Sequence, residues 1–326
     1  MHMEMAAADS GIEAMIVVEG SAEKRFLQLS DDFSSWNDSS FVVIPAPLEA
    51  TVTWGKGTRD GPAAIIEASR HMEAFDFEEE TEHVSRGHGI CTLKIPSWTA
   101  DKEGGTGADR LNNALSDIEN AVRLSRRAGK IPVILGGEHT VTLAAMNALI
   151  KDVEDVFLFV LDAHADLRSE WEGNEISHAT VTARIAGDLG VPTILFGVRS
   201  ASREEWELIN SRKLSNLEVI TASEFIEHDR ERALSRIMRA VRGKKLYISI
   251  DLDVLDPSEA PAVGTPEPGG LSFRELTEVL FSATGACHEL VGFDVVEAAP
   301  IPGLRNTEYL AAALIYRMMG ACSFRK

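Results

Sequence analysis

The stretch that decides the fold is VFLFVLDAHAD at residues 156–166, in which six apolar residues run into Asp162, His164 and Asp166. A continuous apolar run of this length is typical of a strand that is buried on both faces of a parallel sheet. Residues two apart on a strand share one face, so the two carboxylates and the imidazole would point to the same side. The stretch therefore predicts a buried strand with a polar cluster at its carboxyl end.

Two further apolar runs end in the same way. LYISIDLD at residues 246–253 places Asp251 and Asp253 two apart, and IPVILGGEH at residues 131–139 ends on His139. Two carboxylates about 4 Å apart repel each other by roughly 4 kcal/mol at an effective dielectric constant near 20. Four converging aspartates would therefore raise their own pKa values or move apart unless cations lie between them. Six ligands that are mostly hard oxygens suit two divalent ions of the manganese type better than one tetrahedral zinc ion.

The rest of the chain alternates apolar runs with helical patterns. We expect strands at residues 41–44, 131–135, 156–161, 193–196, 217–220, 246–250 and 290–296. We expect helices at residues 109–128, from a capping box at Ser272 and Glu275 to about residue 283, and from Asn306 or Thr307 to residue 319. This alternation predicts an α/β fold, a mostly parallel central sheet with helices on both sides in a three-layer αβα sandwich. Open sheets of this kind hold their sites at the carboxyl ends of the strands.

Composition and net charge limit the possible domain organisation and the possible binding partners. Residues 1–40 are acidic and rich in serine, and we expect them to form an N-terminal extension to a single domain at residues 41–326. The net charge of −19 argues against nucleic acid as a partner and would attract a small cationic substrate. We expect no membrane partner, because no segment is apolar for long enough to span a bilayer. Three cysteines without metal-like spacing, and no visible secretory signal, predict reduced thiols and a cytoplasmic location.

The motifs together resemble the arginase/agmatinase (ureohydrolase) family, and most closely its agmatinase branch. The resemblance covers most of residues 41–320. It rests on GGEHT at 136–140, DAHAD at 162–166, SH at 177–178, DLDVLDP at 251–257, GTPEPGGL at 264–271, Glu297, and upstream GTRDGP at 57–62.

The resemblance implies an arginase-like fold, a site with two Mn²⁺ ions per subunit, and a homo-oligomer of three or six chains. By the family pattern, one ion would be held by His139, Asp162, Asp166 and Asp251, and the other by Asp162, His164, Asp251 and Asp253. The pattern also implies three catalytic residues. Asp166 would deliver a proton to the leaving amine, His178 would shuttle protons or steady the substrate, and Glu297 would accept hydrogen bonds from a guanidinium.

The resemblance leaves the guanidino substrate open. Glu170, Glu172 and Glu175 precede His178 and favour a cationic tail, whereas Arg168 in the same loop could meet a carboxylate. We therefore expect hydrolysis of agmatine to putrescine and urea, in a step of polyamine biosynthesis. The alternatives are arginase, guanidinobutyrase or formimidoylglutamase activity at the same metal site. A polyamine-binding relative without activity and a deacetylase-like single-zinc enzyme are two further readings, and both fit a complete set of six ligands less well.

Overall fold

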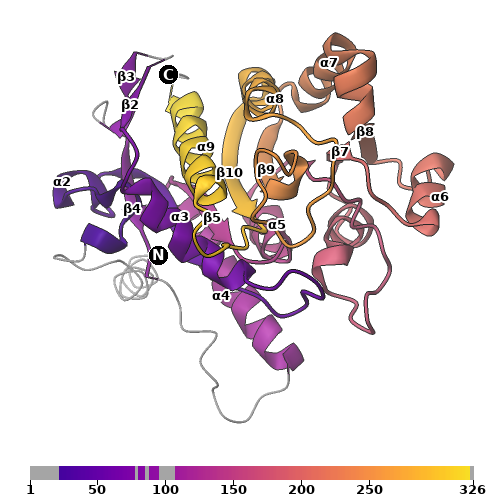
Figure 1. Ribbon diagram of the computed structural model, residues 1–326, viewed down its shortest axis with the longest axis horizontal. Coiled ribbons are helices and arrows are strands. Elements are labelled where there is room, and N and C mark those ends of the chain that lie inside the picture. Colours follow the sequence, from indigo (N-terminus) through magenta and orange to yellow (C-terminus); the bar gives the residue numbers. More distant parts are fainter. Residues whose placement is uncertain (1–21, 78–79, 85–87, 95–106, 324–326) are drawn as a thin grey trace.

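An eight-stranded parallel sheet forms the centre of the molecule (Figure 1). The computed structural model describes residues 22–77, 80–84, 88–94 and 107–323. The strands of the sheet are β1 (Ser39–Ala46), β4 (Gly89–Thr92), β5 (Ile131–Gly136), β6 (Val156–Leu161), β7 (Thr193–Val198), β8 (Leu217–Thr221), β9 (Lys245–Asp251) and β10 (Glu289–Val296). A separate antiparallel pair is formed by β2 (Phe75–Asp76) and β3 (Thr81–Glu82).

The strand order is β4-β1-β5-β10-β9-β6-β7-β8, and every neighbouring pair is parallel. All seven expected strands lie in this sheet, so the predicted α/β class and the parallel arrangement are confirmed. The one strand of the sheet that was not expected is β4, an edge strand of four residues, which is too short to show a pattern of its own. The order places β10 and β9 between β5 and β6, although β10 follows β6 by well over a hundred residues in the chain.

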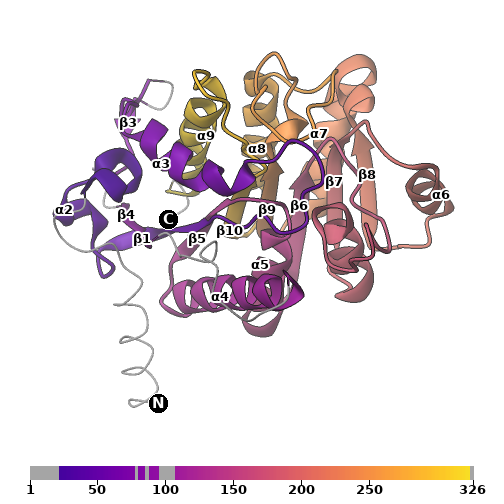
Figure 2. The ribbon, with the colours of Figure 1, turned by 60° about the horizontal axis from the view of Figure 1, so that its bottom comes forward.

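Helices cover both faces of the sheet, which confirms the three-layer sandwich (Figure 2). One face carries α3 (Gly61–Ser69), α7 (Arg230–Val241), α8 (Phe273–Ala286) and α9 (Asn306–Ser323), and the other carries α4 (Gly107–Arg127) and α5 (Val141–Asp152). Successive residues of a strand point into the helix layers on opposite faces of the sheet. Phe159 packs with the first group of helices and its neighbours Leu158 and Val160 with the second. The continuous apolar runs are thus explained by burial on both sides.

The remaining elements are short. They comprise η1 (Ala22–Lys24), η2 (Phe26–Gln28), α2 (Asp31–Ser34), η3 (Thr58–Asp60), η5 (His178–Thr180), η6 (Ala183–Asp188), α6 (Arg203–Ser211), η7 (Glu224–His228) and η8 (Leu252–Val254). No helix among the described residues is both long and apolar enough to cross a membrane. Of the cysteines, Cys91 and Cys287 are buried, while the side chain of Cys322 lies outside the described part.

Two helix ends differ from expectation. The capping box of Ser272 and Glu275 opens α8 as expected, but the helix continues through Gly285 to Ala286. Helix α9 likewise continues through Gly320. A Cβ atom at Gly320 would lie 2.3 Å from the ring of His83, so this glycine permits close packing instead of ending the helix.

The expected N-terminal extension falls partly outside the described residues, because it includes residues 1–21. Within residues 22–38, Phe26 is fully buried in the core, and its N–H donates a hydrogen bond to Oγ1 of Thr92 in β4. Arg25 is also buried and forms an ion pair with Asp31. These contacts attach the segment before β1 to the edge of the sheet. The boundary between extension and domain at residue 40 stays a prediction.

Candidate metal centre and active site

The candidate site lies at the carboxyl ends of four adjacent strands, β5, β10, β9 and β6. His139 follows β5, Glu297 follows β10, Asp251 ends β9 with Asp253 just beyond it, and residues 162–166 follow β6. Strands β6 and β9 are direct neighbours, with Leu161 paired to Ile250. The two aspartate-bearing stretches therefore start level with each other. The structure brings together all six residues that the sequence assigned to metal binding.

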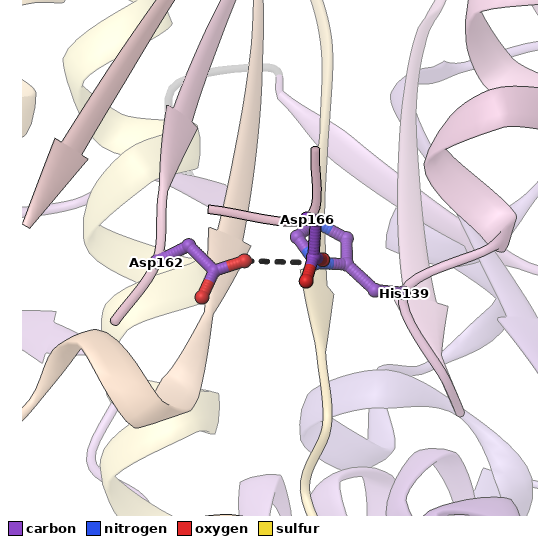
Figure 3. A group of neighbouring side chains, drawn as sticks. All are labelled: His139, Asp162 and Asp166. Carbon is purple, nitrogen blue, oxygen red and sulfur yellow. Dashed lines mark ion pairs between the residues drawn. The ribbon is translucent and has the colours of Figure 1, made fainter. Parts of the chain in front are cut away.

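The first cluster of potential ligands consists of His139, Asp162 and Asp166 (Figure 3). Nδ1 of His139 lies 3.1 Å from Oδ2 of Asp162, 3.3 Å from Oδ2 of Asp166 and 3.5 Å from Oδ2 of Asp251. His139 and Asp162 are almost completely buried. Within the described residues, Nδ1 of His139 and Oδ2 of Asp162 are buried and form no hydrogen bond. Buried polar atoms are rarely left this way, and a cation between them would satisfy both.

The second cluster consists of Asp162, His164 and Asp253. Nδ1 of His164 lies 2.8 Å from Oδ2 of Asp253 and 3.6 Å from Oδ1 of Asp162. Asp162 thus faces the first cluster with Oδ2 and the second with Oδ1. Its Oδ1 also accepts a hydrogen bond of 2.6 Å from the N–H of His164. A carboxylate shared between two clusters is the arrangement that a pair of divalent cations requires.

The electrostatics of the cluster show that its carboxylates compete for ionisation. Burial, together with the charge of Asp162, raises the pKa of Asp166 to about 7. Burial, together with Asp253 and Asp162, raises the pKa of Asp251 well above its usual range. For His164, burial opposes protonation, but the nearby Asp162 and Asp253 raise its pKa to about 12. Without cations the site therefore binds protons, as expected for a surplus of buried negative charge. Its donor set of carboxylate oxygens and imidazoles fits divalent ions of the manganese type.

A buried polar network orients the ring of His139. Nε2 of His139 lies 3.0 Å from Oγ of Ser249, which donates a 2.7 Å hydrogen bond to Asp294. Tyr247 and Thr142 donate hydrogen bonds to the other oxygen of Asp294. Because Nε2 is engaged in this network, Nδ1 is left to face the ligand cluster. Sequence reasoning missed Asp294, although a charged residue inside the apolar run 290–296 was the available signal.

His178 lies near the cluster, on a segment tied to the opposite wall of the site. Its N–H donates to Oγ1 of Thr51 over 3.0 Å, and its Nδ1 lies 3.2 Å from the same oxygen. Glu138 fixes Thr51 by accepting hydrogen bonds from the N–H and the hydroxyl of that residue. Burial is the largest influence on His178 and lowers its pKa, so the ring is neutral near pH 7 and able to accept a proton.

Glu297 closes the site on the side of β10. Its N–H donates to the carbonyl of Gly137, and its Oε1 accepts a 2.7 Å hydrogen bond from the N–H of His139. Burial and the nearby charge of Glu138 raise the pKa of Glu297 to about 8.

Backbone strain also marks this site. Glu297 has a φ of 64° and Asp166 a φ of 51°, both in the left-handed region. Residues other than glycine adopt that region at a cost of about 1–2 kcal/mol. Such strain recurs where the surrounding structure fixes a functional side chain.

A cavity of about 290 Å³ opens over the cluster. Its lining includes His178 and Glu297, together with Arg168, Trp171 and Glu205. The guanidinium of Arg168 stacks on the ring of Trp171 at 4.4 Å, with a carboxylate oxygen of Glu205 3.9 Å away. The three glutamates that favoured a cationic tail, at positions 170, 172 and 175, are exposed and are not part of this lining. The acidic side chain beside Arg168 is instead the buried Glu205.

Comparisons with known proteins identify the family of the chain. The model of the Arginase family matches residues 39–320. The chain is 33% identical over 301 residues to an N(1)-aminopropylagmatine ureohydrolase of Synechocystis sp., covering 92% of this chain and 94% of that protein. It is 31% identical over 288 residues to an agmatinase of Bacillus anthracis, covering 87% and 92%.

The fold is similar to that of a solved relative. The crystal structure of the agmatine ureohydrolase of Thermoplasma volcanium matches with a TM-score of 0.76 at 28% identity, covering 96% of this chain and 97% of that one. The resemblance noted from the motifs is thus confirmed. The chain belongs to the Arginase family and is a hydrolase of the agmatinase-like ureohydrolase type.

Proposed function

We propose that this protein uses two Mn²⁺ ions to hydrolyse the guanidinium group of agmatine, with urea and putrescine as products. The observation that carries the proposal is the sharing of Asp162 between two clusters, one with His139 and one with His164. Both clusters border the same cavity as His178 and Glu297. A site of this kind combines a place for two cations with polar groups for a substrate above them.

The six residues would hold the two ions as the family pattern implies. One ion would be held by His139, Asp162, Asp166 and Asp251, and the other by Asp162, His164, Asp251 and Asp253. When bound, two divalent cations lower the pKa of a shared water toward neutrality and so supply the nucleophile. Asp251 would contribute to both ions by the family pattern; its Oδ2 lies 3.5 Å from Nδ1 of His139, and its Oδ1 accepts a hydrogen bond from the N–H of Asp253.

The charge of the site favours a cationic substrate. Four aspartates and Glu297 carry five negative charges when ionised, against four positive charges on two divalent ions. The net charge of about −1 attracts a guanidinium and disfavours an anion at the reacting centre. This preference concerns the guanidinium end of the substrate, and Arg168 and Glu205, which also line the cavity, would be available to contact its tail.

Three side chains would perform the remaining steps. Glu297 would accept hydrogen bonds from the planar N–H groups of the guanidinium, a pairing for which a carboxylate is suited. Asp166 would pass a proton to the leaving amine. His178, neutral near pH 7, would accept a proton and exchange it with solvent.

N(1)-aminopropylagmatine is a second candidate substrate. It is favoured by the names of relatives from Synechocystis sp. and Thermus thermophilus, the latter 36% identical over 287 residues. This compound carries the same guanidinium with a longer cationic tail, so it needs the same chemistry and a longer cavity. Arginase, guanidinobutyrase and formimidoylglutamase activities are further alternatives, which would use the same metal site with a different substrate. A homo-oligomer of three or six chains and a cytoplasmic location stay predictions.

A substrate panel tests the proposal. Metal-free protein would be reloaded with Mn²⁺ and its metal content measured. Urea release would be followed with agmatine, N(1)-aminopropylagmatine, arginine and 4-guanidinobutyrate, and formamide release with formiminoglutamate. We expect two ions per chain and the highest kcat/KM with one of the first two compounds. A chain that binds two ions but releases no product from any compound would contradict the proposal. A single bound ion per chain would favour the deacetylase-like alternative.

A further inference from the structure

Arg199 follows β7, and its guanidinium lies behind the turn that carries Asp253. Nη2 donates hydrogen bonds to the carbonyls of Asp253 (2.6 Å) and Leu255 (3.2 Å). Nη1 donates to the carbonyls of Val254 (3.3 Å) and Gly197 (3.2 Å). Three consecutive carbonyls of the turn are therefore bound by one side chain. This binding fixes the backbone from which Asp253 reaches the second cluster.

The same guanidinium binds the loop at residues 264–271. Nη2 donates to the carbonyl of Glu267 over 2.8 Å, and Nε donates to that of Pro268 over 3.1 Å. Oε1 of Glu267 in turn lies 3.7 Å from Nε2 of His164, on the side of the ring opposite the ligand cluster. A carboxylate behind a ligating histidine fixes the orientation of the ring. Arg199 thus also acts on His164, through the position of Glu267.

The backbone at Arg199 also binds the segment that carries Asp162, the third residue of this cluster. The N–H groups of Arg199 and Ser200 both donate to the carbonyl of Ala163, which lies between Asp162 and His164. The packing leaves no spare room, because a Cβ atom at Gly270 would lie 2.6 Å from Nη2 of Arg199. The first cluster has a different support, since His139 is held through Ser249 and Asp294. In the described part of the chain, no hydrogen bond of Arg199 reaches that network.

We propose that Arg199 is a positioning residue for the second cation site, the one formed by Asp162, His164 and Asp253. The inference rests on the proposed function, because it assumes that this cluster holds a cation. Among the described residues, every hydrogen-bond acceptor of the guanidinium is a backbone carbonyl, so the residue works through its fork of donors. A lysine supplies one compact ammonium group and cannot reproduce that fork. The two cation sites should therefore respond differently to the loss of Arg199.

The test is a Mn²⁺ titration of metal-free Arg199→Lys protein, followed by equilibrium dialysis and electron paramagnetic resonance. We expect the first ion to bind as in the wild type and the second to bind roughly 10–100-fold more weakly, the usual effect of losing a partner behind a ligand. At equal Mn²⁺, the spectrum of a magnetically coupled pair should give way to that of a single ion. Arg236→Lys is the matched control, because this half-buried arginine binds Glu218 and the carbonyl of Val219, away from the site.

A second measurement needs no metal. In the metal-free protein, hydrogen exchange should be faster in Arg199→Lys at the amides of Asp256 and Leu271, whose hydrogen bonds join the two loops that Arg199 holds. If the lysine variant fails to fold, Arg199→Gln, which keeps a planar group with two donors, takes its place. Unchanged binding of both ions, or equal weakening of both, would overturn the inference. Two ions in the wild type without any urea release would overturn the proposed function and leave the inference on Arg199 standing.

Discussion

The two halves of the candidate metal centre are built differently. The side chain of His139 in the first half is 1% exposed, and it is supported by residues of the strands themselves, Ser249 and Asp294. The side chain of His164 in the second half is 26% exposed, and loops held by Arg199 support it. Among the described residues, Asp162 is the carboxylate common to both ligand clusters, and Asp251 would also contribute to both ions by the family pattern. Strand positions are fixed by the core, whereas loops depend on a few hydrogen bonds, so we expect the second half to bind its ion more weakly.

The largest effect should come from the residue that both halves share. Asp162→Asn removes a charge from each cluster while keeping the size of the side chain, so both ions should be lost and activity should fall to background. Metal content and urea release from the same sample measure this. Asp152→Asn is the control, because Asp152 is a carboxylate on the surface that pairs with Arg127. An Asp162→Asn protein that keeps both ions would contradict the claim that both ions depend on Asp162.

A smaller but still large effect is expected at His178, which belongs to neither half. His178→Asn should lower kcat by roughly 10²–10⁴-fold, the usual contribution of a proton-transferring side chain, while both ions bind normally. The limb of the pH–rate profile that reports a group with a depressed pKa should disappear. Steady-state kinetics across pH, with metal content measured in parallel, check this. Loss of metal in this variant would show that His178 supports the ligands instead.

A substitution at Asp294 should weaken cation binding in the first half of the centre alone. Asp294→Asn keeps the size of the side chain but replaces one acceptor oxygen by an amide donor, which cannot accept the hydrogen bonds that Tyr247, Ser249 and Thr142 donate to the carboxylate. We expect roughly 10–100-fold weaker binding of the first ion, the mirror image of the Arg199→Lys result. Mn²⁺ titration monitored by electron paramagnetic resonance measures it. Preferential loss of the second ion would reverse the assignment of supports to halves.

The smallest effect expected is on stability as a function of pH. In the metal-free protein the pKa values of Asp166, near 7, and Glu297, near 8, lie above those of an unfolded chain. The folded state therefore binds more protons than the unfolded state, and stability falls as the pH rises from about 4 toward 8. Cations displace those protons, so the rise in Tm on adding Mn²⁺ should be larger at pH 8.5 than at pH 6. A rise that is equal or smaller at pH 8.5 would contradict this account.

The local sequence predicts the ligand residues more directly than it predicts the residues that surround and support them. A buried parallel strand demands an unbroken apolar run, so Val156–Leu161 and its polar ending could be recognised without a structure. That β5, β10, β9 and β6 are neighbours in the sheet could not be predicted, because pairing between strands far apart in the chain leaves no local pattern. The same limit hides Arg199 and Asp294, whose roles depend on contacts made across the fold. It also explains why the three glutamates at 170, 172 and 175 suggested a cavity lining that Arg168, Trp171 and Glu205 form instead.

The most direct test of the paired site is a crystal of the protein soaked with Mn²⁺ and measured at the manganese absorption edge. The account predicts two anomalous peaks about 3.5–4 Å apart, one on each side of the carboxylate of Asp162. The peak near His164 should have the lower occupancy at limiting Mn²⁺. A single peak, or two peaks of which neither touches Asp162, would contradict it.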